Sequence, residues 1–406
     1  MKQEPNTNLP NLVRKRAQWL VLIDNLLVII GFYLLFPMIT VHYVDNLGWS
    51  AALVTAGLAL RTFTQQGLTV LAGAYADRIG AKPLITAGLA LRGISFLIFA
   101  HADSISLLML SCLVAGLGGA LFDSPKSAVI VKLTRSKERA HFYALLGTLG
   151  TVGTCSGAAL GGWLLAFDFR WVAYAGACSF FIASILTLWL LPPFRVGVRQ
   201  DDLLAGLRQV WKDKNFVMFS LAGSGFWLLW LQMMSTLPLL VTRITGHQSS
   251  VAWMYTLEAI LTLSLQYPIA HWSVGRWSSE SRLQTAMSAM ILGLLLTSMA
   301  STPALLWTSL AIFTVGVVIG DPALQESTAR RLDPRLRGAY LGFNSIGMAI
   351  SGGLGYMISG WLYQTTLAWG HPSLGWIGIA SMGIVCLAYL NRAINPPAPR
   401  MLRSQA

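Results

Sequence analysis

A chain of 406 residues in which 55% are hydrophobic and only 11% are charged has too little polar surface for a water-soluble protein of this size. The formal net charge is +13, which could suggest a nucleic-acid partner. The basic residues are distributed as in a membrane protein, however, so this charge needs no nucleic acid to explain it. We therefore expect the chain to be embedded in a lipid bilayer.

Twelve apolar segments are each long enough to cross the hydrocarbon core of a bilayer, which is roughly 30 Å thick. They lie at 19–40, 50–72, 84–100, 105–127, 142–164, 171–191, 216–240, 251–271, 284–300, 304–325, 340–362 and 374–391. The sequence therefore predicts an all-α integral membrane protein with twelve transmembrane helices.

The basic residues predict the orientation of these spans, because Lys and Arg are retained on the cytoplasmic side. If both termini are cytoplasmic, all but four of the 29 Lys and Arg residues lie in cytoplasmic segments. Arg170 and Arg243 fall in outer loops, and Arg61 and Arg92 fall within spans. We expect a multi-pass protein with both termini in the cytoplasm and with an affinity for anionic lipid.

The cysteines and histidines give no sign of a metal centre. The four cysteines lie inside apolar segments without a CxxC spacing, and the six histidines lie in loops or at span ends. This pattern favours neither a disulfide framework nor a metal site, and we expect no cofactor.

An internal repeat appears at an offset of 198 residues. The offset spans six helices, so the two halves share one orientation and predict a parallel repeat of two six-helix lobes with a substrate site near mid-membrane between them. We assign 1–191 to the first lobe, 192–214 to a cytoplasmic linker with a short amphipathic helix, and 215–406 to the second lobe. The offset places Asp123, Arg139 and Gly157 onto Asp321, Arg337 and Gly355, and Gly162, Trp163 and Leu164 onto Gly360, Trp361 and Leu362.

The repeat leaves two details open in the second lobe. The equivalent loop of the second lobe, "HWSVGRWSSESR", has Gly275 at the position that corresponds to Asp77 of the first lobe. The partner of Asp321 cannot be inferred from the sequence. We also expect Pro125 and Pro322 to end or kink their helices.

The stretch "GAYADRIGAK" concentrates charge in a short predicted loop between spans two and three, on the cytoplasmic side. A carboxylate there can face the positive end of a neighbouring helix and accept from its free N–H groups. The two basic residues then need anions nearby, and the carboxylate in "LFDSPKS" is the expected partner of Arg78. The residues of this predicted latch are Gly73, Asp77, Arg78, Gly80, Lys82 and Asp123.

The spacing of that loop resembles the signature of the major facilitator superfamily. In span five, "GTCSGAALGG" is similar to the GxxxGPxxGG pattern of the drug:proton antiporter branch, although Ala158 stands where proline is usual. The resemblance implies a monomer in a bacterial inner membrane, and a latch that docks against span eleven of the other lobe, closes the inner side and breaks when the transporter opens inward. In the alternative interpretation these charges only fix topology.

The glycines of span five give a narrow face for close helix packing. The resemblance implies that this helix lies between the lobes and restricts leakage, which favours exchange. The glycines concerned are Gly153, Gly157, Gly161 and Gly162.

Ionisable residues within spans indicate where transport is coupled to protons, because a charge near the bilayer centre needs a partner or water. Glu258 shares one helical face with Tyr255, Thr262 and Gln266, which predicts a cavity lining and a carboxyl able to exchange a proton for substrate. A structural, hydrogen-bonded glutamate is the alternative. Asp24 is a second candidate for proton coupling, or an interfacial residue.

Arg61 lies near the middle of span two, too central to reach the membrane surface easily. Gln65 and Thr69 share its helical face. We expect Arg61 to pair with a carboxylate or to bind an anion of the substrate. Span four lacks the arginine usual in proton-coupled relatives, so the chain departs from the usual proton path there.

Span seven offers an adaptable lining for substrate in "GFWLLWLQMMS". Aromatic rings and flexible methionines suit varied amphipathic ligands, including cations. The residues concerned are Trp227, Trp230 and Met233. Packing against lipid or the protein core is the alternative role for such side chains.

These observations predict a secondary active transporter, in which proton-coupled antiport exports amphipathic drugs by alternating access. A symporter or lipid flippase of the same fold is the nearest alternative. A membrane-embedded enzyme such as an acyltransferase has little support, since no nucleophile motif or ligand cluster is present. A sensor that does not transport is a further alternative.

Overall fold

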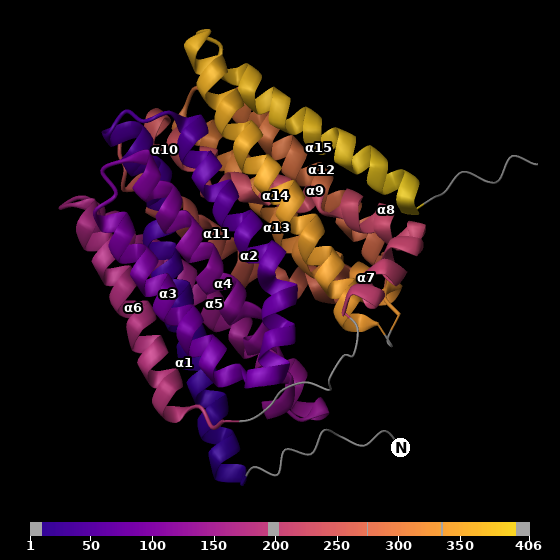
Figure 1. Ribbon diagram of the computed structural model, residues 1–406. Coiled ribbons are helices and arrows are strands. Elements are labelled where there is room, and N and C mark those ends of the chain that lie inside the picture. The colour runs from indigo at the N-terminus through magenta and orange to yellow at the C-terminus, as the bar shows by residue number, and fades with distance from the viewer. Residues whose placement is uncertain (1–9, 194–202, 274, 334–335, 395–406) are drawn as a thin grey trace, which may run out of the picture.

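The computed structural model describes residues 10–193, 203–273, 275–333 and 336–394, and these are helical with no β-strand. The long helices run side by side as a bundle (Figure 1). Within the described ranges, eight helical segments are long and apolar enough to cross a membrane, namely Asn11–Asn46, Ala81–Ala100, Ile105–Leu133, His141–Leu165, Phe169–Leu190, Lys214–Thr245, Pro303–Arg331 and Pro372–Ile394.

The first half of the chain forms six long helices at the predicted positions, most of them extended by several residues beyond the apolar core of each span. Hydrogen-bonding side chains define several of their starts: Ser50 and Ser104 accept from backbone N–H groups three residues ahead, which satisfies part of each helix N-terminus. The helices are α1 (Asn11–Thr40) with a π-helical extension η1 (Val41–Asn46), α2 (Ala51–Ile79), α3 (Ala81–Ala100), α4 (Ile105–Leu133), α5 (Ser136–Leu165) and α6 (Phe169–Leu190).

The second half supplies six more membrane-length segments after a short linker helix, α7 (Leu203–Lys212). The seventh segment consists of α8 (Lys214–Gly223), α9 (Gly225–Trp230), the 3-10 turn η2 (Leu231–Met234) and α10 (Thr236–Thr245). The remaining helices are α11 (Ser250–Ser273), α12 (Ser279–Ser298), α13 (Pro303–Arg331), α14 (Arg337–Ala368) and α15 (Pro372–Ile394). Twelve membrane-length segments are therefore present in the described residues.

Two six-helix lobes make up the bundle. In the first, α1 packs on α5 and α6, and α4 packs between α2 and α3; in the second, α12 packs on α13 and α15. The lobes meet where α2 contacts α14 and where α5 contacts α11. In Figure 1 the first-lobe helices, indigo to magenta, lie mainly toward the left, and α12, α14 and α15 of the second lobe, orange to yellow, lie toward the right. The exact lobe boundaries at 1–191, 192–214 and 215–406 stay a prediction.

The linker helix α7 packs against the second lobe. Its Val210 is fully buried in a small apolar cluster with Phe216, Tyr340 and Phe343. The hydroxyl of Tyr340 also donates to Asp213 Oδ2 at 2.9 Å. This contact attaches the linker to the start of α14.

The predicted loop at residues 73–82 is instead almost entirely helical. α2 continues to Ile79, α3 begins at Ala81, and Gly80 alone separates them with φ +98°. An L side chain disfavours this backbone conformation, so glycine is required there. The prediction failed because the polar composition of the stretch reflects the membrane surface and not a loss of helix.

Two prolines are predicted to end or kink their helices, and neither ends one. Pro125 lies inside α4 and Pro322 inside α13, and both helices continue for at least two further turns. The polar ends of these helices extend beyond the apolar spans, so neither proline marks a helix end.

The seventh span is broken, where the sequence predicted one continuous helix at 216–240. The helix is interrupted at Ser224 and again at Ser235, whose φ of −126° and ψ of −76° are not helical. Pro238 lies three residues beyond the second break, and a proline is tolerated in the first turn of a helix because its missing N–H has no intrahelical acceptor there. A discontinuous helix of this kind is typical of transporter binding sites.

Candidate substrate site at the lobe interface

The two lobes are joined by hydrogen bonds at one end of the bundle. We call this the distal end; Asn11 and Ile394, the outermost described residues of α1 and α15, lie at the opposite, proximal end. Gln364 Oε1 on α14 accepts from the hydroxyl of Ser50 at 2.5 Å and from the backbone N–H of Ala52 at 3.2 Å. Nearby, the hydroxyl of Thr242 donates to Asp45 Oδ2 at 2.7 Å. These bonds hold α14 and α10 of the second lobe to the first.

Small residues bring the lobes into direct contact in the distal half of the bundle. The side chain of Thr55 and the ring of Phe63, both on α2, occupy the space that a Cβ would need at Gly360 and Gly353 of α14. On the other side of the bundle, a Cβ at Gly162 would lie 3.1 Å from the Cβ of Ala252. The distal half is therefore closed.

The same helix faces separate toward the proximal end. One turn beyond Phe63 on α2, Gly67 has no atom of another segment within 4 Å of its Cβ position, and Gly147 on α5 is equally open. The described lobe interface is thus closed distally and open proximally.

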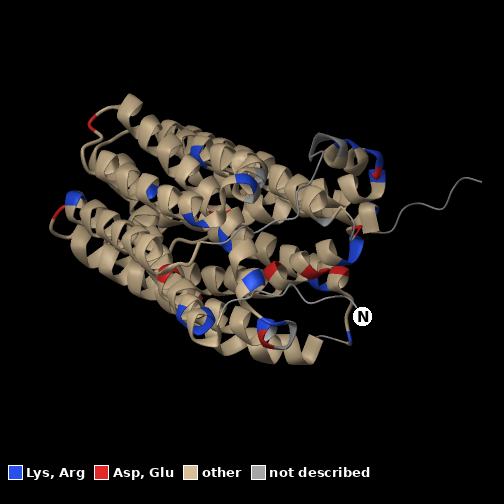
Figure 2. Cartoon of the chain, turned by 60° about the horizontal axis from the view of Figure 1, so that its bottom comes forward, with Lys and Arg blue, Asp and Glu red and all other residues tan. Residues whose placement is uncertain are grey.

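The basic residues are distributed unevenly between the two ends of the bundle. Figure 2 shows more of the basic residues toward the end that carries the label N than at the opposite loops. This distribution agrees with the predicted side for both termini, which stays a prediction.

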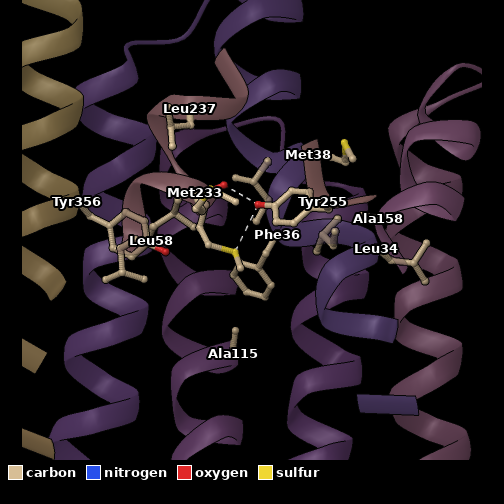
Figure 3. Close-up of a cluster of buried hydrophobic side chains, with 14 of the residues drawn as sticks. Leu34, Phe36, Met38, Leu58, Ala115, Ala158, Met233, Leu237, Tyr255 and Tyr356 are labelled. Carbon is tan, nitrogen blue, oxygen red and sulfur yellow. Dashed lines mark hydrogen bonds between the residues drawn. The ribbon is translucent and has the colours of Figure 1, made fainter. Parts of the chain in front are cut away.

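An aromatic cluster closes the interface at mid-depth. The hydroxyl of Tyr255 on α11 donates to the backbone oxygen of Met233 in the broken seventh span at 2.5 Å, and its ring lies 5.5 Å from that of Tyr33 on α1. Figure 3 shows Tyr255 and Met233 beside Phe36 of α1, with Tyr356 of α14 nearby. Both lobes thus contribute to the predicted substrate region.

Glu258 lies one turn from Tyr255 toward the proximal end. Its Oε2 atom is buried and has no hydrogen-bond partner among the described residues. The hydroxyls of Tyr33 and Tyr255 lie within electrostatic range of this carboxyl group. The predicted face of α11 becomes more open in the proximal direction: Tyr255 is buried, Thr262 is half-buried and Gln266 is exposed.

The tryptophans predicted to line the site are half-buried. The rings of Trp227 and Trp230 are 5.7 Å apart in an edge-to-face arrangement and pack against the hydrophobic core. Met233 is 1% exposed. A role in substrate binding for these three residues stays a prediction, and in this conformation they contribute to packing.

Arg61 is 8% exposed and lies within the first lobe, among the rings of Phe32, Phe36 and Phe180. Its NH1 donates to Gln65 Oε1 at 2.6 Å, and its guanidinium lies 4.6 Å from the centre of the Phe36 ring. The hydroxyl of Tyr356 is within its hydrogen-bonding reach, while its Nε atom is buried without a described partner.

Asp123 differs from its predicted role as the partner of Arg78. Its Oδ2 accepts from Gln65 Nε2 at 2.6 Å and lies 3.6 Å from NH2 of Arg92. Asp123 is on the face of α4 that meets α2 and α3, whereas Arg78 is exposed at the end of α2. The side chain of Asp77 lies outside the described residues.

The other latch residues lie around the junction of α2 and α3. Lys82 is half-buried, and a Cβ at Gly73 would lie 2.7 Å from Ser124 Oγ, which brings α2 close to α4. A latch function for the group stays a prediction.

Asp24 is 6% exposed and lies inside the first lobe, which differs from an interfacial position. Its Oδ2 accepts from the Thr187 hydroxyl at 2.5 Å, and its Oδ1 is buried without a described partner. Lys126 of α4 lines the same small pocket and donates to Asn25 Oδ1 at 2.5 Å. A carboxyl and an amine thus share an apolar pocket within one lobe.

The glycine face of α5 mainly serves packing within the first lobe. A Cβ at Gly153 would lie 3.0 Å from Ile29, and one at Gly157 would lie 2.6 Å from the carbonyl oxygen of Ile30. Gly161 continues this contact along α1, and Gly162 alone of the predicted four faces the other lobe. The glycine stripe therefore joins α5 to α1.

Comparison with known proteins connects this geometry to a family. The family model described as Major Facilitator Superfamily matches residues 22–356. The chain belongs to this superfamily.

Relatives at the level of whole chains are named as multidrug resistance proteins. "Multidrug resistance protein MdtH" of Sodalis glossinidius is 41% identical over 97% of both chains, and its counterpart in Yersinia enterocolitica is 40% identical over 94% of this chain and 95% of its own. The solved structure of the nucleoside transporter NupG has a TM-score of 0.74 at 16% identity and covers 94% of this chain and 100% of its own. This superfamily member is therefore a multi-pass membrane transporter and not an enzyme.

Several residues of the site were not predicted from the sequence of this superfamily member. Asn25 and Lys126 are polar residues in or next to apolar segments, and that signal could have identified them. Tyr33 and Tyr356 carry no charge, so only the packed structure reveals them.

Asp321 occupies the position in the second lobe that Asp123 has in the first, but its partners differ. Asp321 Oδ1 accepts from Gln325 Nε2 at 3.0 Å on its own helix, while Arg282 pairs with Glu326. A further bridge joins Arg331 NH1 to Glu280 Oε1 at 2.7 Å. The second lobe thus connects α12 to α13 by ion pairs of its own at the proximal end.

Proposed function

We propose that this superfamily member exports amphipathic drugs in exchange for protons by alternating access. The single observation that carries the proposal is the unpartnered carboxyl oxygen of Glu258 at the lobe interface. The names of the relatives support drugs as the substrate class. We further propose a monomer in a bacterial inner membrane with both termini cytoplasmic, driven by the proton gradient and without a cofactor.

Closure at one end supports alternating access. With cytoplasmic termini, contacts such as Ser50 to Gln364 close the periplasmic side, and the open faces at Gly67 and Gly147 belong to the cytoplasmic side. This corresponds to an inward-open state. The proposed latch is expected to be broken in that state, and the exposure of Arg78 agrees with this expectation.

Glu258 is suited to exchange because a buried carboxyl oxygen without a partner can be stabilised by a proton or by a cation. The two ligands compete for the same atom, so arrival of one favours departure of the other. The open proximal face of α11 gives both a route to this residue. Asp24 is the second proposed proton carrier, although its pocket lies inside the first lobe.

The test uses purified protein in liposomes with an imposed proton gradient. Lipophilic cations and zwitterionic drugs are added, and drug-dependent proton release is recorded. Wild-type release that is lost in Glu258→Gln and kept in the control Asp103→Asn, an exposed carboxylate of a distal loop, supports antiport. Loss in Asp24→Asn instead would assign the proton to the pocket within the first lobe.

Other outcomes identify the alternatives. Uptake of a drug together with protons would indicate a symporter, and movement of labelled lipid without drug-dependent proton release would indicate a flippase. Drug binding without any transport by folded protein would indicate a sensor, and each of these results overturns the proposal.

A further inference from the structure

The interior of the first lobe holds more positive than negative side chains. Among the described residues of this lobe, Arg61, Arg92 and Lys126 lie near only two carboxylates, the buried Asp24 and the partly exposed Asp123. Arg92 lies beside Asp123, and Lys126 lies within electrostatic range of Asp24. Arg61 therefore forms no ion pair with a carboxylate in the described part of the chain.

Arg61 is held by weaker partners instead. It donates to the amide oxygen of Gln65, lies over the rings of Phe32 and Phe36, and reaches the hydroxyl of Tyr356. Gln65 donates in turn to Asp123, so its amide is fixed and orients the guanidinium. A guanidinium has five N–H donors in a planar fork that matches a carboxylate, and Nε here has no described partner.

Tyr356 connects Arg61 to the other lobe, because it belongs to α14. Its side chain is 1% exposed and lies beside Leu58 of α2 (Figure 3). The neutral Tyr356 hydroxyl lies within electrostatic range of the guanidinium, and a carboxylate is a stronger acceptor than a hydroxyl. An anion that reaches Arg61 therefore competes with the contact between α2 and α14.

We infer that Arg61 is the binding site for the carboxylate of an amphipathic aromatic substrate, and that this carboxylate displaces the hydroxyl of Tyr356 from the guanidinium. The inference rests on the proposed export function and adds the anionic group that its substrates carry. The rings of Phe32 and Phe36 beside Arg61 supply the apolar surface for the aromatic part. Binding would loosen the mid-depth contact between the lobes, which connects recognition to opening.

Equilibrium binding to purified protein in nanodiscs tests the inference with two matched probes, 1-pyrenebutyrate and its methyl ester. Wild-type protein should prefer the carboxylate. Arg61→Gln should lower carboxylate affinity about tenfold or more, as expected for loss of a charge-assisted pair, and leave ester affinity unchanged. Arg61→Lys should keep part of the preference, and Arg170→Gln, an exposed arginine at the distal end, should keep all of it.

Tyr356→Phe separates competition from ordinary packing. Removing the hydroxyl keeps the ring but frees the guanidinium, so carboxylate affinity should rise about threefold. A purely structural role for Tyr356 predicts unchanged or weaker binding. Equal affinity for carboxylate and ester in wild-type protein, or a preference that survives in folded Arg61→Gln, overturns the inference.

Two further results keep this inference distinct from the proposed function. Carboxylate preference that depends on Arg61, without any drug-dependent proton release, would retain the anion site and reject proton antiport. Proton-coupled export of the ester at the rate of the carboxylate would retain antiport and reject the anion site. Dioctanoyl phosphatidylglycerol serves as a competitor for the bound probe. If this lipid binds the site more tightly than 1-pyrenebutyrate does, the site belongs to a lipid headgroup and the inference is overturned.

Discussion

Thr242 and Asp45 form a hydrogen bond of 2.7 Å between the two lobes at the distal end of the transporter. Asp45 belongs to the π-helical extension of α1, and Thr242 belongs to the last part of the broken seventh span. Together with Gln364, which holds the start of α2, this bond adds polar contacts to the close packing of α2 against α14 at the distal end. Such contacts are individually weak, so closure at this end is reversible.

Gln364→Ala should loosen the distal closure, because one substitution removes the acceptor for both Ser50 and Ala52. Two neutral hydrogen bonds contribute about 1–3 kcal/mol, so the distally open population should rise about tenfold. The measurement is the labelling rate of Thr55→Cys by an impermeant maleimide, in a background without the four native cysteines. Unchanged labelling would show that helix packing alone holds this end closed.

Gly157→Ala should destabilise the first lobe, whereas Gly147→Ala should not. A Cβ at Gly157 would lie 2.6 Å from the carbonyl oxygen of Ile30, and overpacking of this kind typically costs about 1–3 kcal/mol. The Cβ position at Gly147 is open, and alanine favours a helix over glycine. Thermal unfolding in detergent compares the two variants, and equal melting temperatures would contradict the close contact of α5 with α1.

Asp123→Asn should lower stability more than Asp321→Asn, its counterpart in the repeat. Loss of the Asp123 carboxylate leaves Arg92 buried without its charge partner, while Asp321 bonds only to the neutral Gln325. Because Asp123 is partly exposed, we expect a difference of about 1–2 kcal/mol, smaller than for a fully buried pair. Chemical denaturation of both variants provides the measurement; a larger effect of Asp321→Asn would contradict this assignment.

Asp77→Asn should shift the transporter toward the proximally open state if the predicted latch acts as proposed. Gly147→Cys reports that opening, since this position on α5 has open space beside it. The latch predicts faster maleimide labelling from the proximal side, with Asp103→Asn as a matched control in a distal loop. The same labelling rate in both variants would leave the charged stretch with a role in topology only.

The helical segments and the superfamily could be predicted from the sequence because both depend on local signals. Apolar length gave the twelve spans, and the spacing around Gly80 gave the family signature. The break at Ser235 was missed, because hydropathy averages over a window and does not register a single non-helical residue.

Side-chain contacts between different helices were harder to predict from the sequence. Arg61 and Glu258 were identified because each carries a charge inside an apolar segment. The pairing of Asp123 with Gln65 and Arg92 was missed, since it depends on which faces of α2, α3 and α4 meet. The register between helices is a property of packing, and one sequence does not contain it in a readable form.

The single-residue connection at Gly80 has a mechanical consequence. Two long helices joined by one residue cannot separate at that end, so the end of α2 and the start of α3 stay together when either helix moves. Because α2 carries the contact with the second lobe and α3 carries Arg92, movement of the proximal end of α2 against α14 also displaces the start of α3. Movement that begins at the surface between the lobes is thereby carried into the charged interior of the first lobe.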